Sequence, residues 1–194
     1  MALRHAVLAA LYDKPASGYE LSKRFDVSVA NFWHALPQQL YAELARLEQA
    51  GLVDAEEVVQ DRRPNKRVFS LTAAGRRELA EFVEAAARPT ALKDDLLVKV
   101  QAADAGDVAR LAEHLEERAT QARAKLELYD GLAERLRGGR DEGTYLAEAR
   151  RIGPYLTLAR GRAHERENVE WCEWAAGALR ARAGNAANVP EHLP

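Results

Sequence analysis

Four of the six residues at positions 62–67 carry a positive charge and could bind the phosphate groups of a nucleic acid. These are Arg62, Arg63, Lys66 and Arg67. Lys and Arg neutralise phosphates and release the counterions condensed on the nucleic acid. A charge run of this kind, taken alone, is most often a solvated surface turn. Its interpretation therefore depends on the elements that hold it.

A helix expected to begin at Pro37 presents polar side chains opposite its apolar stripe. The stripe consists of Leu40, Leu44 and Leu47, and Gly51 follows where the helix should end. The opposite side carries Gln38, Gln39, Ala42, Glu43 and Arg46. Glutamine can donate to and accept from base edges in the major groove of DNA. We expect Gln38, Gln39, Ala42 and Arg46 to face bases or adjacent phosphates.

Two shorter helices are expected before this one. The first spans about residues 3–11, where leucine and valine recur at helical spacing. The second opens at a capping box, in which the Ser17 hydroxyl and the Glu20 carboxylate satisfy amides at the helix start. Its buried side is predicted to consist of Tyr19, Leu21 and Phe25.

Strand patterns enclose the cationic turn. Residues 52–59 form the outgoing strand and residues 67–71 the returning strand, after which Thr72 caps a fourth helix that runs to about Arg88. Helix, helix, helix and two-stranded hairpin is the order of a winged helix-turn-helix. In such a module the third helix fits the major groove of DNA, and the hairpin, or wing, lies along the neighbouring backbone.

Beyond a boundary at about residues 88–90, the pattern is helical throughout. A long helix follows Gly106-Asp107 and ends at Gly138-Gly139, and a final helical region at about 144–182 is either kinked or divided at Gly153-Pro154. The predicted fold is therefore mainly α with a small β-hairpin. Its parts are a winged helix-turn-helix domain at 1–88, a helical dimerisation domain at 89–183 and a flexible tail at 184–194.

The long helix carries about eight apolar positions at steps of three and four residues, a pattern typical of a coiled-coil seam. Such a seam needs a facing surface, because wet apolar area costs about 25 cal/mol per Å². We expect that surface to be a second copy of the chain, in a homodimer that presents two recognition helices to two half-sites. The alternative is that the helix packs within its own chain.

Aromatic residues form the second candidate site. Most often such residues at helical spacing belong to a core or a dimer interface. The functional alternative is an effector pocket between the two domains, formed by Phe32, Trp33, Tyr155, Trp171 and Trp174. A ligand there would change DNA affinity only through its differential binding to one state of the dimer.

Composition excludes several other classes of protein. With 194 residues and a net charge of −2, the chain is not polybasic, so any nucleic-acid site must be a local patch. Cys172 is the only cysteine and is expected to be inert packing. His164-Glu165 lacks the second histidine of a zinc-protease motif, and no catalytic constellation appears, so we expect neither an enzyme nor a metal or cofactor. No segment predicts a signal peptide or a membrane span, which favours a cytoplasmic protein.

Several motifs, taken in their order along the chain, resemble those of the PadR family of bacterial transcriptional regulators. The matching segments are residues 17–21, 32–33, 39–53 and 63–75, and the helical remainder is similar to the virulence-activator-like C-terminal domain through residues 93–99 and 158–166. The resemblance implies a homodimer on an inverted-repeat operator, with Tyr41 positioned on the DNA backbone and Lys66 and Arg67 as basic wing residues. It also implies a hydrophobic or aromatic effector. Leu36 departs from the small polar cap that relatives often carry.

These observations together predict a homodimeric, cytoplasmic transcriptional regulator that binds double-stranded DNA, more as a repressor than as an activator. The alternative is a winged-helix adaptor that binds proteins and not DNA, which the slightly acidic total charge would permit.

Overall fold

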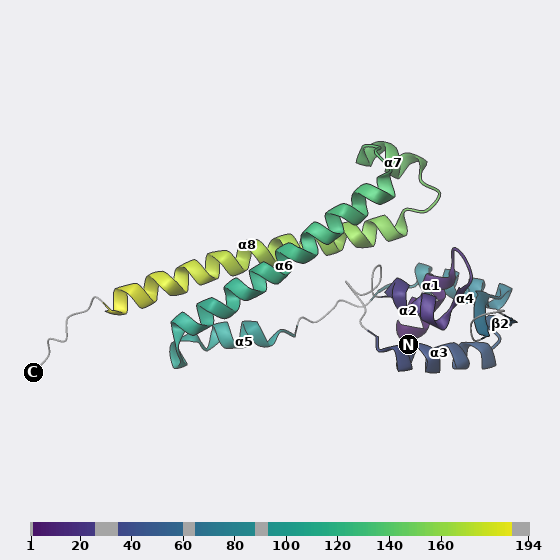
Figure 1. Ribbon diagram of the computed structural model, residues 1–194, viewed down its shortest axis with the longest axis horizontal. Helices are drawn as coiled ribbons and strands as arrows, with labels where there is room; N and C mark the ends of the chain where they lie inside the picture. The colour runs from purple at the N-terminus through teal and green to yellow at the C-terminus, as the bar shows by residue number, and fades with distance from the viewer. Residues whose placement is uncertain (1, 26–34, 60–64, 88–92, 188–194) are drawn as a thin grey trace, which may run out of the picture. The chain divides into compact units, whose positions relative to one another are not determined.

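The computed structural model divides the chain into two compact units, Met1–Pro89 and Thr90–Pro194. The residues that the structure describes are 2–25, 35–59, 65–87 and 93–187. Each unit is described by itself, and Figure 1 gives the labels of the elements.

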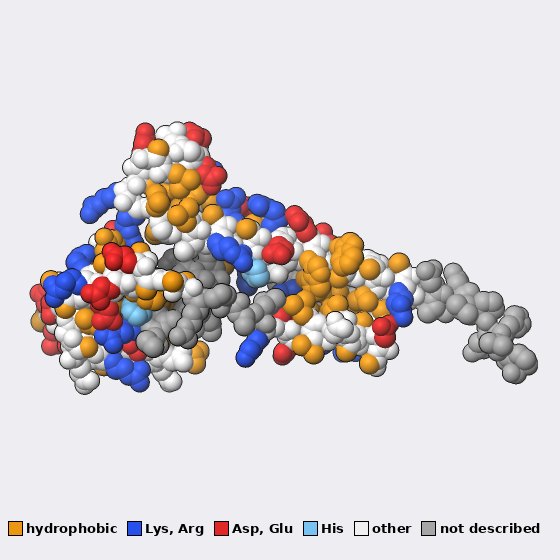
Figure 2. All heavy atoms as spheres, turned by 180° about the vertical axis from the view of Figure 1, so that it is seen from behind, with side chains coloured by type: hydrophobic (Ala, Val, Ile, Leu, Met, Phe, Trp, Pro, Cys, Tyr) orange, Lys and Arg blue, Asp and Glu red, His pale blue; other side chains and the backbone are white. Residues whose placement is uncertain are grey.

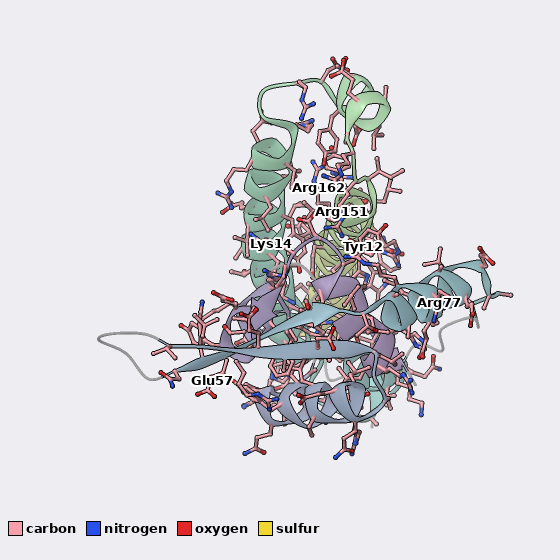
Figure 3. All side chains as sticks on the ribbon, turned by 90° about the vertical axis from the view of Figure 1, so that its right-hand side faces the viewer. Tyr12, Lys14, Glu57, Arg77, Arg151 and Arg162 are labelled. Atoms are coloured by element: carbon pink, nitrogen blue, oxygen red, sulfur yellow. The ribbon has the colours of Figure 1, made fainter. Side chains whose placement is uncertain are left out.

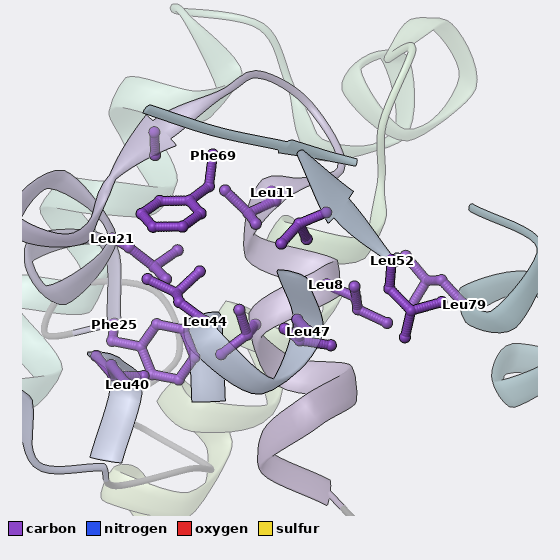
Figure 4. Close-up of a cluster of buried hydrophobic side chains, with 13 residues drawn as sticks. Leu8, Leu11, Leu21, Phe25, Leu40, Leu44, Leu47, Leu52, Phe69 and Leu79 are labelled. Atoms are coloured by element: carbon purple, nitrogen blue, oxygen red, sulfur yellow. The ribbon is translucent and has the colours of Figure 1, made fainter. Parts of the chain in front are cut away.

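The N-terminal unit contains four helices around one apolar core. They are α1 (Ala2–Leu11), α2 (Gly18–Arg24), α3 (Pro37–Gln49) and α4 (Ala73–Glu84). Leucines from all four helices meet Phe25 and Phe69 in this core (Figure 4). The predicted stripe of α3 supplies Leu40, Leu44 and Leu47, each almost completely buried. The core therefore fixes which side of α3 remains exposed.

The sheet of this unit has three antiparallel strands, in the order β1-β3-β2. They are β1 (Ala16–Ser17), β2 (Val53–Val58) and β3 (Lys66–Leu71). The predicted hairpin is confirmed, with Val53 opposite Leu71 and Val58 opposite Lys66. The sequence did not predict β1, because two residues are too few to show the alternation of a strand.

Side-chain caps set the start of α2 and α4, as predicted. The Glu20 amide donates to Ser17 Oγ at 3.3 Å, and the Ser17 amide donates to the Glu20 carboxylate at 2.8 Å. Thr72 Oγ1 accepts from the Gly75 amide at 3.0 Å. Two expectations were wrong. Tyr19 is 66% exposed instead of buried, and α4 ends at Glu84 instead of about Arg88.

The C-terminal unit consists of helices and one short 3-10 turn. Its elements are α5 (Asp95–Gln101), η2 (Ala103–Ala105), α6 (Val108–Arg137), α7 (Glu142–Glu148) and α8 (Gly153–Ala187). The final helical region is divided, not kinked, because Gly153 and Pro154 open α8. Helix α8 also continues through residues 184–187, which the sequence had indicated as part of a tail.

Helices α6 and α8 pack antiparallel within the same chain (Figure 1). One cluster joins Leu115 and Ala119 of α6 to Cys172 and Ala176 of α8, and a second joins α6, α7 and α8 through tyrosines. Helix α8 therefore covers most of the predicted seam of α6, as in the alternative of packing within the chain, so the seam by itself does not require a partner subunit. None of the described helices is long and apolar enough to span a membrane.

The start of α4 approaches the chain leading into β2 so closely that only glycine fits. A Cβ at Gly75 would lie 3.1 Å from the Leu52 carbonyl carbon and still nearer to its oxygen. We predict that Gly75→Ala lowers the free energy of unfolding of the N-terminal unit by about 1–3 kcal/mol, as overpacking does. Chemical denaturation followed by circular dichroism measures this loss.

Gly131→Ala is the matched control, because nothing lies within 4 Å of the Cβ that it would add on α6. It should stabilise the protein by about 0.5–1 kcal/mol through its helix propensity. Equal stability of the Gly75 variant and the native protein would contradict the close packing of α4 on the Leu52 carbonyl.

Candidate nucleic-acid interface

Helix α3 presents a continuous outward face. With its leucines in the core, Gln38, Tyr41, Ala42 and Arg46 are exposed. Figure 3 shows the β2–β3 hairpin, labelled at Glu57, running over α3 and extending beyond it. The exposed helix face and the hairpin thus belong to one rigidly cored unit, as the sequence predicted for a recognition helix and a wing.

The N-terminus of α3 is capped by one of the predicted base-reading residues. Pro37 occupies the first turn, and the Leu36 amide donates to Gln39 Oε1 at 2.9 Å. Leu36 cannot cap the helix with its side chain, so the Gln39 side chain accepts this hydrogen bond in place of a cap residue. Gln39 therefore has a structural role that the sequence did not indicate.

Tyr41 lies on the backbone of α2. A Cβ at Gly18 would lie 2.9 Å from two carbons of the Tyr41 ring and closer still to Cε1, so Gly18 makes room for this ring. The Tyr41 side chain remains half exposed. The absence of a side chain at Gly18 therefore allows the Tyr41 ring to lie against the start of α2.

A groove of about 860 Å³ lies where α2, α3 and β3 converge. Its lining residues are Ser17, Gly18, Tyr19, Glu20, Tyr41, Ala45, Asn65, Lys66, Arg67 and Phe69. Tyr19, expected in the core, stands here instead, with the Lys23 ammonium 5.8 Å from its ring centroid. Tyr19 was missed because the helical spacing of Tyr19, Leu21 and Phe25 does not show which face of so short a helix is covered.

Three described cations of this surface are paired with carboxylates. Lys66 Nζ lies 3.4 Å from Glu20 Oε1, and Arg67 Nη2 lies 2.6 Å from Glu48 Oε1. Arg46 pairs with the buried Glu43 at 3.1 Å. The sequence predicted concentrated positive charge, but the described part of the surface is locally balanced. Arg62 and Arg63 lie outside the described residues.

Glu20 has two roles at once. It completes the capping box and pairs with Lys66. The Ser17 backbone amide lowers the pKa of the Glu20 carboxyl below its usual value, against a smaller opposing effect of desolvation, and Lys66 lowers it further. The carboxylate is therefore held in place by Ser17 whether or not Lys66 stays beside it.

Among the described aromatic residues of the predicted effector pocket, Tyr155 lies apart from Trp171 and Trp174. Tyr155 is fully buried in the cluster at α7 and donates to Glu142 at 2.7 Å, whereas Trp171 packs against the separate cluster around Cys172. Sixteen residues of one helix separate them, a rise of about 24 Å. Trp174 is 70% exposed. Phe32 and Trp33 lie outside the described residues.

Trp171 instead borders a groove of about 760 Å³ between α5, α6 and α8, which Arg118, His164 and Cys172 also line. Burial raises the pKa of the Cys172 thiol, so the thiolate is disfavoured. Across residues 2–25, 35–59, 65–87 and 93–187, no group of three or more His, Cys, Asp or Glu is placed to hold a metal ion.

Three helices followed by an antiparallel hairpin, with a polar face on the third helix, define a winged helix-turn-helix, here joined to a helical second unit. Residues 7–81 match the model of the transcriptional regulator PadR-like family, and residues 92–180 match that of the virulence activator alpha C-terminal domain. The chain belongs to the PadR-like family of transcriptional regulators, which confirms the resemblance seen in its motifs.

Individual relatives of the chain are also named as transcriptional regulators. The chain is 34% identical over 192 residues to the probable transcriptional regulator Rv1176c of Mycobacterium tuberculosis, covering 94% of this chain and all of the relative. It is 24% identical over 172 residues to the negative transcriptional regulator PadR of Bacillus subtilis, covering 88% of this chain and 93% of the relative.

Solved structures show the same fold. Bacillus subtilis PadR in complex with operator DNA matches with a TM-score of 0.78 at 23% identity, over 92% of this chain and 99% of that one. The same protein in complex with p-coumaric acid matches with a TM-score of 0.71 at 22% identity, over 93% of this chain and 99% of that one.

The cap on α3 can be tested by substitution. We predict that Gln39→Ala lowers the free energy of unfolding by about 0.5–1 kcal/mol, because the Leu36 amide loses its partner. Gln39→Glu should retain this stability, since glutamate fills the same position of a capping box. Denaturant titration measures both variants.

Gln38→Ala serves as the control on the same turn, because Gln38 is exposed and should change stability by less than about 0.5 kcal/mol. If Gln39→Ala were as stable as Gln38→Ala, the capping role of Gln39 would be rejected.

Proposed function

We propose that this protein is a sequence-specific DNA-binding repressor. The observation that carries the proposal is the fixed outward face of α3, with Gln38, Tyr41, Ala42 and Arg46 exposed because the leucines behind them are buried. An α-helix of this kind fits the major groove, where each base pair presents a distinct pattern of donors and acceptors. Repression is supported by one relative, PadR of Bacillus subtilis, which is named a negative transcriptional regulator.

Each residue group has a separate task in this proposal. Gln38 and the amide nitrogen of Gln39 contact base edges, while Gln39 Oε1 keeps the helix start in place. Tyr41, held against Gly18, contacts the DNA backbone. The wing residues Arg62, Arg63, Lys66 and Arg67 contact phosphates beside the groove. Contacts to phosphate position the protein, and contacts to bases specify the sequence.

The exposed apolar surface of the C-terminal unit, not the seam of α6, supports a homodimer as the second part of the proposal. Leu97 and Val98 on α5 and Trp174 on α8 remain exposed, and Figure 2 shows hydrophobic side chains gathered on this unit. Apolar side chains gathered at the surface are typical of an interaction site. In a twofold dimer the two recognition helices read two half-sites of an inverted repeat about one DNA turn apart.

An aromatic effector is the third part of the proposal. Bacillus subtilis PadR has been solved in complex with p-coumaric acid, which supports a small aromatic acid as the class of ligand. Phe32 and Trp33 remain candidates for its site, and Trp171 borders the groove of the C-terminal unit. Tyr155 is buried in the core of the C-terminal unit and is therefore no longer a candidate for this site. Such a ligand releases DNA only if it binds the DNA-free state more tightly.

One observation favours the alternative of a winged-helix adaptor that does not bind DNA. Arg46, Lys66 and Arg67 are each in an ion pair with a carboxylate, and the chain as a whole has a net charge of −2. A mobility-shift assay with the promoter upstream of the protein's own coding sequence separates the two functions. We place the repressor in the cytoplasm, where bacterial DNA lies, and assign it no enzymatic activity.

The wing can be tested through the salt dependence of binding. We predict that Arg62→Ala, Arg63→Ala and Lys66→Ala together weaken binding to duplexes of any sequence. The slope of log affinity against log salt should fall by up to about 2.7, since each full phosphate contact contributes about 0.9. Fluorescence anisotropy with labelled duplexes over a range of salt concentrations measures both effects.

A matched variant removes three exposed cations of the C-terminal unit, Lys99, Arg110 and Arg135, and so changes the net charge equally. It should leave the slope nearly unchanged. Equal slopes for the wing variant and the native protein would refute the role of the wing.

The dimer can be tested on Trp174. We predict that the native protein sediments at twice the 21.5 kDa of one chain and that Trp174→Glu shifts it toward the monomer, because the charge would have to be buried. Arg166→Glu, which introduces the same side chain at an exposed position of the same helix, should leave the protein a dimer. Analytical ultracentrifugation over a concentration range gives the answer, and a native monomer at every concentration would contradict the proposed dimer.

A further inference from the structure

Two carboxylates stand within the proposed DNA-binding surface and hold its cations. Glu20 comes from the first turn of α2, and Glu48 from the last turn of α3. Their partners, Lys66 and Arg67, are neighbours on β3 and line the same groove. Three separate elements thus bring two cations and two carboxylates together beside the exposed face of α3.

The geometry shows that neither pair is buried. The side chains of Arg67 and Glu48 are 56% and 34% exposed, and those of Lys66 and Glu20 are comparably open. Exposed pairs of this kind are weak and are screened by salt. A phosphate of DNA can therefore replace either carboxylate without unfolding any element.

The carboxylates do not follow their cations when this exchange occurs. Glu20 is fixed by the Ser17 amide at 2.8 Å as part of the capping box. Glu48 is fixed to α3, whose leucine stripe is buried in the core. If Lys66 and Arg67 turned to phosphates, both carboxylates would stay at the surface without their counter-ions.

We propose that Glu48 and Glu20 compete with DNA phosphates for Arg67 and Lys66 and thereby weaken binding to DNA of any sequence. This inference rests on the proposed DNA-binding function. The competition does not change the base contacts of α3, so it reduces only the sequence-independent part of the affinity. The base contacts then contribute a larger share of the total binding free energy. Glu48 and Glu20 act as positioning residues, because they act through the two cations.

The test is the affinity of Glu48→Gln for a duplex of unrelated sequence. The neutral amide has nearly the same shape and releases Arg67, so affinity at low salt should rise about two- to fivefold, the range that the weak pair implies. The salt slope should become steeper by up to about one, because the freed cation now binds a phosphate with no carboxylate to replace. Glu20→Gln should behave alike and keep the cap, since glutamine also completes a capping box.

The control for net charge is Glu116→Gln in the C-terminal unit. Glu116 pairs with Arg180 at 2.6 Å, the same distance as Arg67 to Glu48, and the substitution changes the charge of the chain equally. It should alter DNA affinity by less than about 1.5-fold, since Glu116 is paired with Arg180 and not with a cation of the proposed DNA-binding surface. Circular dichroism of each variant checks that the fold is intact.

A second comparison separates competition from plain repulsion between Glu48 and the DNA. In an Arg67→Gln background, Glu48→Gln should lose most of its effect, because there is no cation left to release. An undiminished effect in that background would overturn the inference, as would equal affinities for Glu48→Gln and Glu116→Gln. Absence of DNA binding by the native protein and every variant would overturn the proposed function and the inference with it.

Discussion

Everything in the candidate interface depends on the burial of one side of α3. Leu40, Leu44 and Leu47 pack against Leu8 and Leu21 in a single core, and their burial is what turns the polar side of the helix outward. Burying a leucine is worth about 1.5–3 kcal/mol, far more than any exposed polar contact of this surface. The apolar contacts therefore decide the orientation, and the polar side chains follow it.

Small local devices then set the details of that surface. Gln39 caps the start of α3, and Gly18 leaves room for the Tyr41 ring. Glu20 belongs both to the cap of α2 and to the pair with Lys66, so the start of α2 is coupled to the wing strand. The same few residues thus serve stability and the proposed recognition, and a substitution that changes DNA binding need not touch DNA.

The sequence predicted most elements of the N-terminal unit, because capping residues, proline and periodic leucines act over a few neighbours. It could not predict β1, which exists only through pairing with β3, or the exposure of Tyr19 on a helix of seven residues. The division at Gly153 and the covering of α6 by α8 depend on contacts between distant segments. The ion pairs of Arg67 and Lys66 were missed for the same reason, since their partners lie 19 and 46 positions away.

The most direct test of the central claim is selection of bound duplexes from a random DNA pool by the purified protein. The proposed repressor should enrich one inverted repeat, with half-sites about one helical turn apart. Enrichment should be lost when the exposed face of α3 is altered while its leucines are kept. A pool that remains random after repeated selection at low salt would contradict recognition of DNA by this helix.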